Sequence, residues 1–159
     1  MLAADPKTPG WSDVRAAINK GLPKTAIEKL EPIIERATTQ KKYAEAIRGI
    51  SMKIALEGNI QGNKAQEKIV RMQAEIKKAP AEMKPVMNAL LANWYWHYFQ
   101  QNRWRFQQRT RTAAAPNGDF ETWGLARILD EIDKQFQVCL LYTSPSPRDQ
   151  RGSRMPSSA

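Results

Sequence analysis

The segment Asn93–Thr112, NWYWHYFQQNRWRFQQRTRT, decides how the rest of the chain is interpreted. It carries seven of the thirteen aromatic residues and four arginines, and it has no carboxylate. Each such ring gains about 1.5–3 kcal/mol when it is fully buried. The segment therefore predicts a surface elsewhere in the molecule that covers these rings.

The spacing of the apolar residues predicts one long helix from Met83 to about Phe106. A stripe with helical spacing is formed by Met87, Leu90, Leu91, Trp94 and Tyr98. Tyr95, Trp96 and Phe99 fall on other sides of the same helix. A helix that is apolar on several sides packs between neighbours, which favours the central helix of an all-α stack.

Two other interpretations of the segment remain open. Rings that alternate with arginines can stack on bases while the guanidinium groups contact phosphates, as in a nucleic-acid-binding module. The arginine-rich end can also dock onto another domain of the same parent chain. The candidate docking and packing residues are Trp94, Trp96, Tyr98, Arg103, Trp104, Arg105, Arg109 and Trp123.

Shorter amphipathic patterns precede and follow this segment, and no strand-like alternation of useful length occurs before residue 137. We expect Ser12 to cap a first helix that stops at Gly21, Pro32 to kink the second helix, and Gly58-Asn59 to end the third. The expected helices are 12–20, 23–37, 42–56, 65–79, 83–106 and 123–136, with a turn-rich connection over 112–119.

These patterns predict an all-α fold of irregular antiparallel helical hairpins, similar to a tetratricopeptide stack. The expected organisation is an irregular lead-in over residues 1–10, a helical domain over 11–137 and a disordered tail over 138–159. No run of eighteen apolar residues occurs, so no membrane-spanning segment is expected.

The residues that carry chemistry are sparse. Cys139 is the single cysteine and His97 the single histidine, so we expect no disulfide framework and no metal site. His97 is interpreted as a packed or surface histidine. No phosphate-binding loop, dinucleotide fingerprint or hydrolase motif is present. We therefore expect neither an enzyme nor a cofactor, and the net charge of +9 alone selects no partner.

The tail has a composition of its own. Residues 139–159, CLLYTSPSPRDQRGSRMPSSA, have three prolines and no periodicity. They resemble the conceptual translation of a sequencing adaptor that recurs at the ends of environmental gene fragments. On this interpretation the tail has no function, the natural protein continues differently past about Gln137, and the net charge falls from +9 to +7 without the tail's three arginines and one aspartate.

Three stretches carry a resemblance to a known family: GLPKTAIEKLEPII, NWYWHYFQQNRWRFQQRT and FETWGLARILDEIDKQF. Together they resemble the N-terminal helical region of large bacterial alpha-2-macroglobulin family proteins, of the kind found in planctomycetes and Bacteroidetes. The similarity runs from Trp11 to Phe136, and the aromatic-arginine block and the Thr122-Trp123 pair are its most specific parts.

The resemblance implies a parent protein that is periplasmic, anchored in the cell envelope or secreted, and that resembles a protease inhibitor in host or cell-envelope defence. It implies β-sandwich domains after the helical region and proteases as partners of those later parts. No Cys-Gly-Glu-Gln stretch is present, so no thioester residue is assigned here. The expected function is a non-catalytic helical scaffold or interaction segment of a truncated parent. The alternative is a free-standing helical-repeat adaptor or a nucleic-acid-binding module.

Overall fold

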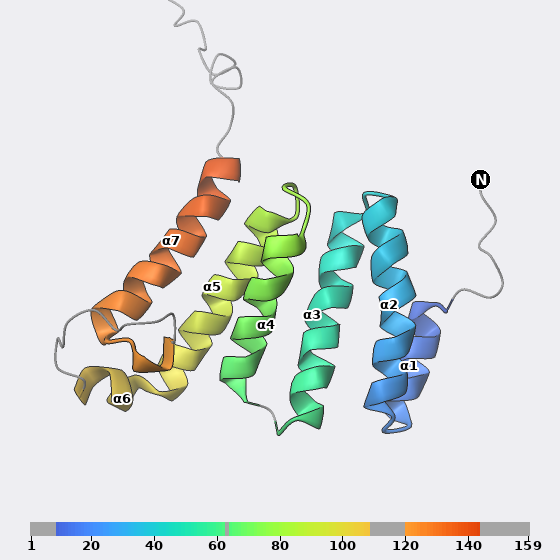
Figure 1. Cartoon of the computed structure of the whole chain (residues 1–159), viewed down its shortest axis with the longest axis horizontal. Coiled ribbons are helices and arrows are strands. Elements are labelled where there is room, and N and C mark those ends of the chain that lie inside the picture. The colour runs from blue at the N-terminus through green and yellow to red at the C-terminus, as the bar shows by residue number, and fades with distance from the viewer. Residues whose placement is uncertain (1–8, 63, 109–119, 144–159) are drawn as a thin grey trace, which may run out of the picture.

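The computed structural model describes residues 9–62, 64–108 and 120–143. Within these ranges the chain forms seven α-helices and one 3-10 helix, and no strand. In chain order they are α1 (Trp11–Asn19), α2 (Pro23–Thr39), α3 (Tyr43–Ile60), α4 (Ala65–Lys78), α5 (Lys84–Gln101), α6 (Arg103–Gln108), η1 (Phe120–Thr122) and α7 (Leu125–Thr143). Figure 1 shows the long helices side by side in a row, with neighbours antiparallel. The predicted all-α stack of antiparallel helices is confirmed.

Helix α2 has the clearest amphipathic pattern, and it packs between α1 and α3. Pro23 stands at its start, where a backbone amide would have no partner inside the helix. Its buried face is formed by Ala26, Leu30, Ile33 and Ala37. Pro32 lies within the continuous helix. The predicted cap of α1 is wrong, because Gly10 and not Ser12 occupies that position and its amide donates to Asp13 Oδ2 at 2.8 Å.

Close packing of α2 against α3 depends on a glycine. A Cβ atom added to Gly49 would lie 2.6 Å from Cγ1 of Ile34, which is closer than real Cβ contacts. The two helices can therefore approach at this level only because Gly49 has no side chain. Helix α3 continues through Gly58, so the predicted stop at Gly58-Asn59 is too early. It ends at Ile60, and the turn to α4 uses Gly62, whose φ is +89°.

The predicted helix from Met83 to Phe106 is broken at Asn102. The Asn102 side-chain amide donates to the carbonyl of Tyr98 at 2.9 Å, and its backbone amide donates to the carbonyls of Tyr98 and Phe99 at 3.1 Å each. Its own carbonyl accepts from Arg105 and Phe106 at the start of α6. Asn102 therefore ends α5 and begins α6, because its short amide competes with the regular helical hydrogen bonds.

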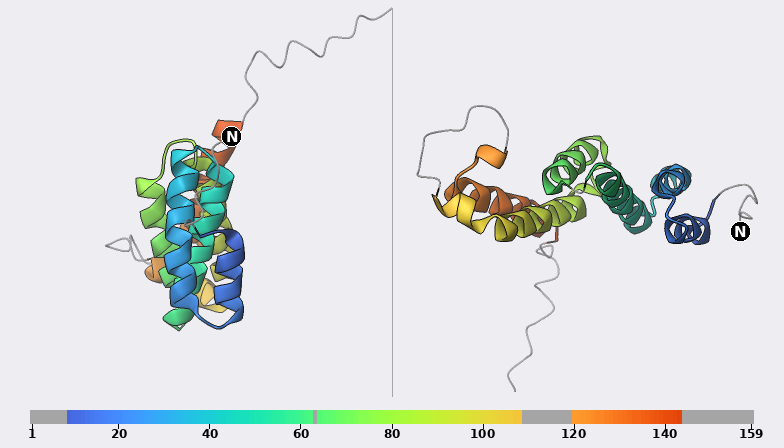
Figure 2. Two further views of the ribbon diagram at one scale, coloured as in Figure 1. Left: turned by 90° about the vertical axis from the view of Figure 1, so that its right-hand side faces the viewer. Right: turned by 90° about the horizontal axis from the view of Figure 1, so that it is seen from below.

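Helix α7 explains why α5 is apolar on more than one side. Both α7 and α4 pack against α5. Figure 2 shows from below that α7 lies beside α5, at the end of the row opposite α1. The expected boundary at Gln137 is too early, because α7 continues to Thr143. Residues 144–159 of the predicted tail, and residues 1–8 of the lead-in, lie outside the described residues.

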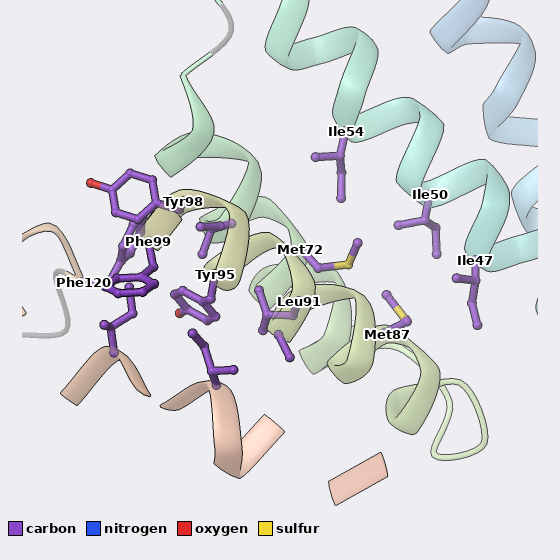
Figure 3. Close-up of a cluster of buried hydrophobic side chains, with 14 of the residues drawn as sticks. Ile47, Ile50, Ile54, Met72, Met87, Leu91, Tyr95, Tyr98, Phe99 and Phe120 are labelled. Atoms are coloured by element: carbon purple, nitrogen blue, oxygen red, sulfur yellow. The ribbon is translucent and has the colours of Figure 1, made fainter. Parts of the chain in front are cut away.

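The core follows the row of helices. Its larger part extends from Ala37 on α2 to Ile132 on α7, and a smaller part lies among α1, α2 and Leu56 of α3. Ile34 contacts both parts, so the apolar interior is continuous. Figure 3 shows the larger part, with Ile47, Ile50 and Ile54 of α3 at one side and the aromatic rings at the other.

Candidate functional site

Tyr95 is the centre of an aromatic cluster at the junction of α4, α5 and α7. Its side chain is fully buried, and its ring meets Phe120 edge-on at 5.7 Å and stacks on Trp123 at 5.9 Å. The Tyr95 hydroxyl accepts a hydrogen bond from Gln73 Nε2 at 2.7 Å. Burial raises the pKa of Tyr95 and the negative charge of Glu131 adds to the rise, whereas the hydrogen bond from Gln73 opposes it. The tyrosine is therefore a neutral core residue.

The other buried rings connect α5 to α6 and η1. Tyr98 lies edge-on to Phe106 at 5.9 Å and to Phe120 at 5.2 Å, and Phe99 lies 5.7 Å from Phe106. Figure 3 shows Tyr98, Phe99 and Phe120 gathered beside Tyr95. Edge-on pairs at these distances are favourable because the positive edge of one ring faces the negative face of the other. Of the predicted docking residues, Tyr98 is thus a packing residue.

Trp123 is also a packing residue. It is buried beside Tyr95, and the guanidinium carbon of Arg127 lies 4.9 Å from the centre of its ring. Arg127 is one turn further along the chain, on α7, so the cation covers the outer side of the indole. Within the Thr122-Trp123 pair, Thr122 is exposed, and Trp123 packs the segment between η1 and α7 against Tyr95 of α5.

Helix α6 is mostly exposed to solvent, in contrast to the buried rings of α5. Its single buried side chain, Phe106, holds the short helix against Tyr98 and Phe99. The three residues at its start, Arg103, Trp104 and Arg105, are exposed, and Trp104 has 76% of its surface open to solvent. We call these three residues the α6 surface. Neither arginine forms an ion pair with another residue of the described ranges.

The remaining predicted residues are divided between interior and surface. Trp94 is half-buried and packs against the core. Trp96 is 42% exposed and contacts Phe99, with ring centres 5.6 Å apart. Arg109 lies outside the described residues. The structure therefore brings Tyr98 and Trp123 together in the core, exposes Arg103, Trp104 and Arg105, and does not gather all eight residues into one site.

A pocket between α3, α4 and α5 was not predicted. It has a volume of about 270 Å³, and Trp94, His97, Tyr98 and Gln101 line it from α5. These positions follow helical spacing, so they share one face of α5. The sequence could therefore have shown that these four residues share a face of α5. It could not show that Lys68 and the alanines of α3 and α4 lie next to that face, because this depends on how the helices pack.

Across residues 9–62, 64–108 and 120–143, no three side chains of the His, Cys, Asp and Glu types gather closely enough to hold an ion. In the same ranges, no helix combines the length and hydropathy needed to cross a bilayer.

The fold and these surfaces define a class of protein: an all-α stack of antiparallel helices whose aromatic segment is buried at α5 and open to solvent at α6. No family model, curated protein or solved structure matches the chain.

Proposed function

We propose that this chain is a non-catalytic helical interaction segment. It packs internally through the aromatic cluster around Tyr95 and docks onto another domain of its parent chain through the α6 surface. The observation that carries the proposal is the exposure of Trp104 on a helix whose neighbouring rings are buried. The neighbouring rings of Tyr98, Phe99 and Phe106 are buried in the core, whereas the ring of Trp104 remains exposed to solvent.

The composition of the α6 surface is typical of an interface. Tryptophan and arginine are the residue types that contribute most to protein–protein binding when they are desolvated at the centre of a contact. Phe106 anchors α6 in the aromatic cluster, so Trp104 is presented on an ordered element. Arg103 and Arg105 flank the indole without an acidic partner in the described ranges, which favours a contacting surface that carries carboxylates.

The parent that we propose is an alpha-2-macroglobulin-like protein of the cell envelope, the periplasm or the secreted fraction. The support for this parent is the sequence resemblance over Trp11–Phe136. A protease-inhibiting role in defence would belong to the later domains of that parent. The helical segment would contribute a rigid support and the docking contact.

A longer reading frame from the same locus tests the proposal. We expect the frame to continue past Gln137 into β-rich domains. The longer protein is labelled with 5-fluorotryptophan and studied by ¹⁹F NMR. A soluble paramagnetic agent should broaden the Trp104 signal in the present chain and should broaden it much less in the longer protein. Trp104→Phe assigns the signal, and the buried Trp123 is the internal control. A stop codon directly after the last helix, or equal access to Trp104 in both proteins, would contradict the proposal.

A nucleic-acid-binding module is the second candidate, and the exposed Trp104 between two arginines is the observation that favours it. Binding of this kind weakens steeply as salt rises, because contacts with phosphates release counterions. Fluorescence anisotropy with labelled oligo(dT) and oligo(rU) at low salt separates the two candidates. Our proposal expects no binding. Binding that falls with salt and is weakened by Arg105→Ala would favour the second candidate instead.

A further inference from the structure

Helix α5 differs from the other described α-helices in the side chains that it exposes to solvent. Its exposed residues, which we call the α5 outer face, are Val86, Asn93, Trp96, His97, Gln100 and Gln101. None of them is a lysine, arginine, aspartate or glutamate, although these four types make up 26% of the chain. Every other described α-helix exposes at least one such residue, for example Glu28 on α2 and Lys77 on α4. The α5 outer face is therefore an uncharged surface on a highly charged protein.

Trp96 supplies the largest apolar group of the α5 outer face. Its side chain is 42% exposed, and its ring centre lies 5.6 Å from that of Phe99, which is buried. The core thus supports the indole through Phe99 while part of the ring stays open to solvent. A ligand that stacks on an indole held in this way loses little free energy in ordering it.

Two carboxamides flank this indole along the helix. Asn93 precedes Trp96 by three residues and Gln100 follows it by four, so the three side chains are neighbours on one side of α5, with Cβ atoms about 5–6 Å apart. Both amides are exposed, and neither side chain forms a hydrogen bond with another residue of the described ranges. A carboxamide can both donate and accept hydrogen bonds. The indole therefore has a free donor and acceptor group on each side.

This combination of groups suits an uncharged sugar ring. A pyranose has a face of C–H groups that can lie on an indole, and hydroxyl groups at its edge that both donate and accept hydrogen bonds. Nucleic acids and anionic lipids require cations for their phosphates, and the α5 outer face supplies none. A protein partner would have to remove water from both amides, which is costly unless each amide finds a new partner.

We propose that the α5 outer face binds a neutral oligosaccharide. One pyranose ring stacks on Trp96, and its hydroxyl groups form hydrogen bonds with Asn93 and Gln100. The shared chemistry is an uncharged chain of pyranose rings, which both a glucan and an N-acetylhexosamine glycan possess. The site is independent of the α6 surface, because no residue of α6 takes part in it.

The full chain labelled with 5-fluorotryptophan tests the proposal by ¹⁹F NMR. It has five tryptophans, and Trp96→Phe assigns the signal of Trp96. Titration with cellotetraose or tetra-N-acetylchitotetraose should move this signal in a saturable way, with a Kd in the millimolar range expected for one ring on an open surface. The signal of Trp104, which is more exposed, should not move and is the internal control. Pentaethylene glycol, which has ether oxygens but no ring, should move neither signal.

Variants separate the contribution of the amides from that of the indole. The imidazole signals of His97, the one histidine in the chain, report on the α5 outer face when Trp96 is replaced. Asn93→Ala and Gln100→Ala should each weaken binding about two- to tenfold, through the loss of one hydrogen bond. Trp96→Ala should abolish binding, while the circular dichroism spectrum is retained. The matched control is Asn59→Ala, which removes an exposed amide near the end of α3 and should leave the affinity unchanged.

The outcomes either support or overturn the proposal. It is wrong if neither oligosaccharide moves the Trp96 signal saturably, if the Trp104 signal moves as much, or if Asn59→Ala weakens binding as much as Asn93→Ala. An affinity that falls as salt rises would show that charged groups carry the binding, which also contradicts it. Binding of one oligosaccharide alone assigns the site to glucans or to N-acetylhexosamine glycans, and equal binding assigns it to the pyranose ring common to both. A negative result leaves the proposed role of the α6 surface untouched.

Discussion

At the scale of single residues, Tyr95 shows how one polar atom is accommodated in the aromatic core. Its hydroxyl is buried and satisfied by Gln73, and its ring contacts Phe120 and Trp123. Burial, together with the charge of Glu131, raises the pKa of the hydroxyl in the folded protein. The charged phenolate is thus disfavoured in the fold and free to form in the unfolded chain.

This difference predicts the behaviour of the protein at alkaline pH. A tyrosine in an unfolded chain loses its proton near pH 10. Because the folded-state pKa is higher, the contribution of Tyr95 is complete below about pH 10 and falls as the pH rises further. Tyr95→Phe should cost about 1 kcal/mol at pH 7, through loss of the hydrogen bond, and should show a smaller loss of stability between about pH 10 and 11 than the unchanged protein.

Urea unfolding at pH 7, 9, 10 and 11 measures this difference. The matched control is Tyr43→Phe on α3, where the ring is only half-buried at the edge of the core. At each pH, the free energy of unfolding of the variant is subtracted from that of the unchanged protein. This difference removes the contribution of the lysines, which titrate in the same pH range. Parallel stability curves for the unchanged protein and Tyr95→Phe would contradict the prediction.

At the scale of elements, the turns after α1 and α2 share one hydrogen-bond pattern, but a different residue type has the positive φ in each turn. After α1, the amide of Gly21 donates to the carbonyl of Ile18, and the next amide donates to the carbonyl of Ala17. After α2, Lys41 makes the equivalent bond to Thr38. Both residues have positive φ, +70° for Gly21 and +56° for Lys41. This ending favours glycine, because a Cβ atom is strained in the left-handed region.

Lys41→Gly should therefore stabilise the protein by about 0.5–1 kcal/mol, a gain that is smaller than the full strain because glycine is also freer in the unfolded chain. Gly21→Lys, the reverse change in the equivalent turn, should destabilise by a similar amount. Thermal unfolding of both variants checks the pair. Lys41→Ala, which removes the side-chain charge but keeps the Cβ atom, should have little effect. A gain as large for Lys41→Ala as for Lys41→Gly would assign the effect to charge.

The elements also show how far the sequence predicts this structure. The helical stripes were sufficient for the all-α fold, and Met87, Leu91 and Tyr98 of the stripe predicted for the aromatic helix are buried. The breaks were harder, because they depend on individual side-chain contacts. Asn102 interrupts α5 by bonding back to Tyr98, and Gly58 lies inside α3 with the side chain of Lys68 packed next to it. Neither contact follows from local composition.

The candidate site was predictable only in part for the same reason. The aromatic segment predicted that rings would be covered, and Tyr95, Tyr98, Phe99 and Phe106 are buried. Which rings stay exposed depends on the break at Asn102, which turns Trp104 away from the path of α5. The pocket depends on residues from three helices, and that convergence is a property of the fold alone.

At the scale of the whole molecule, the row of helices ends with an apolar face on α7. Ile128 and Ile132 are buried against the core, while Leu129 and Phe136 are about 40% exposed on another side of the same helix. Leu140 and Leu141 extend the exposed set toward the end of α7. Exposed apolar residues that lie together favour association, unlike the same residues scattered singly.

We therefore expect the isolated chain to self-associate through α7 as its concentration rises. The double variant Leu129→Gln with Phe136→Gln should remain closer to a monomer in light scattering, because the association would depend on apolar area that these changes remove. The control is Val70→Gln with Val86→Gln, which replaces similarly exposed apolar residues on α4 and α5. If both double variants reduce association equally, the effect follows from general hydropathy and not from the α7 face. A monomer at every concentration of the unchanged chain would show that this face is too small to drive association, despite its position at the open end of the stack.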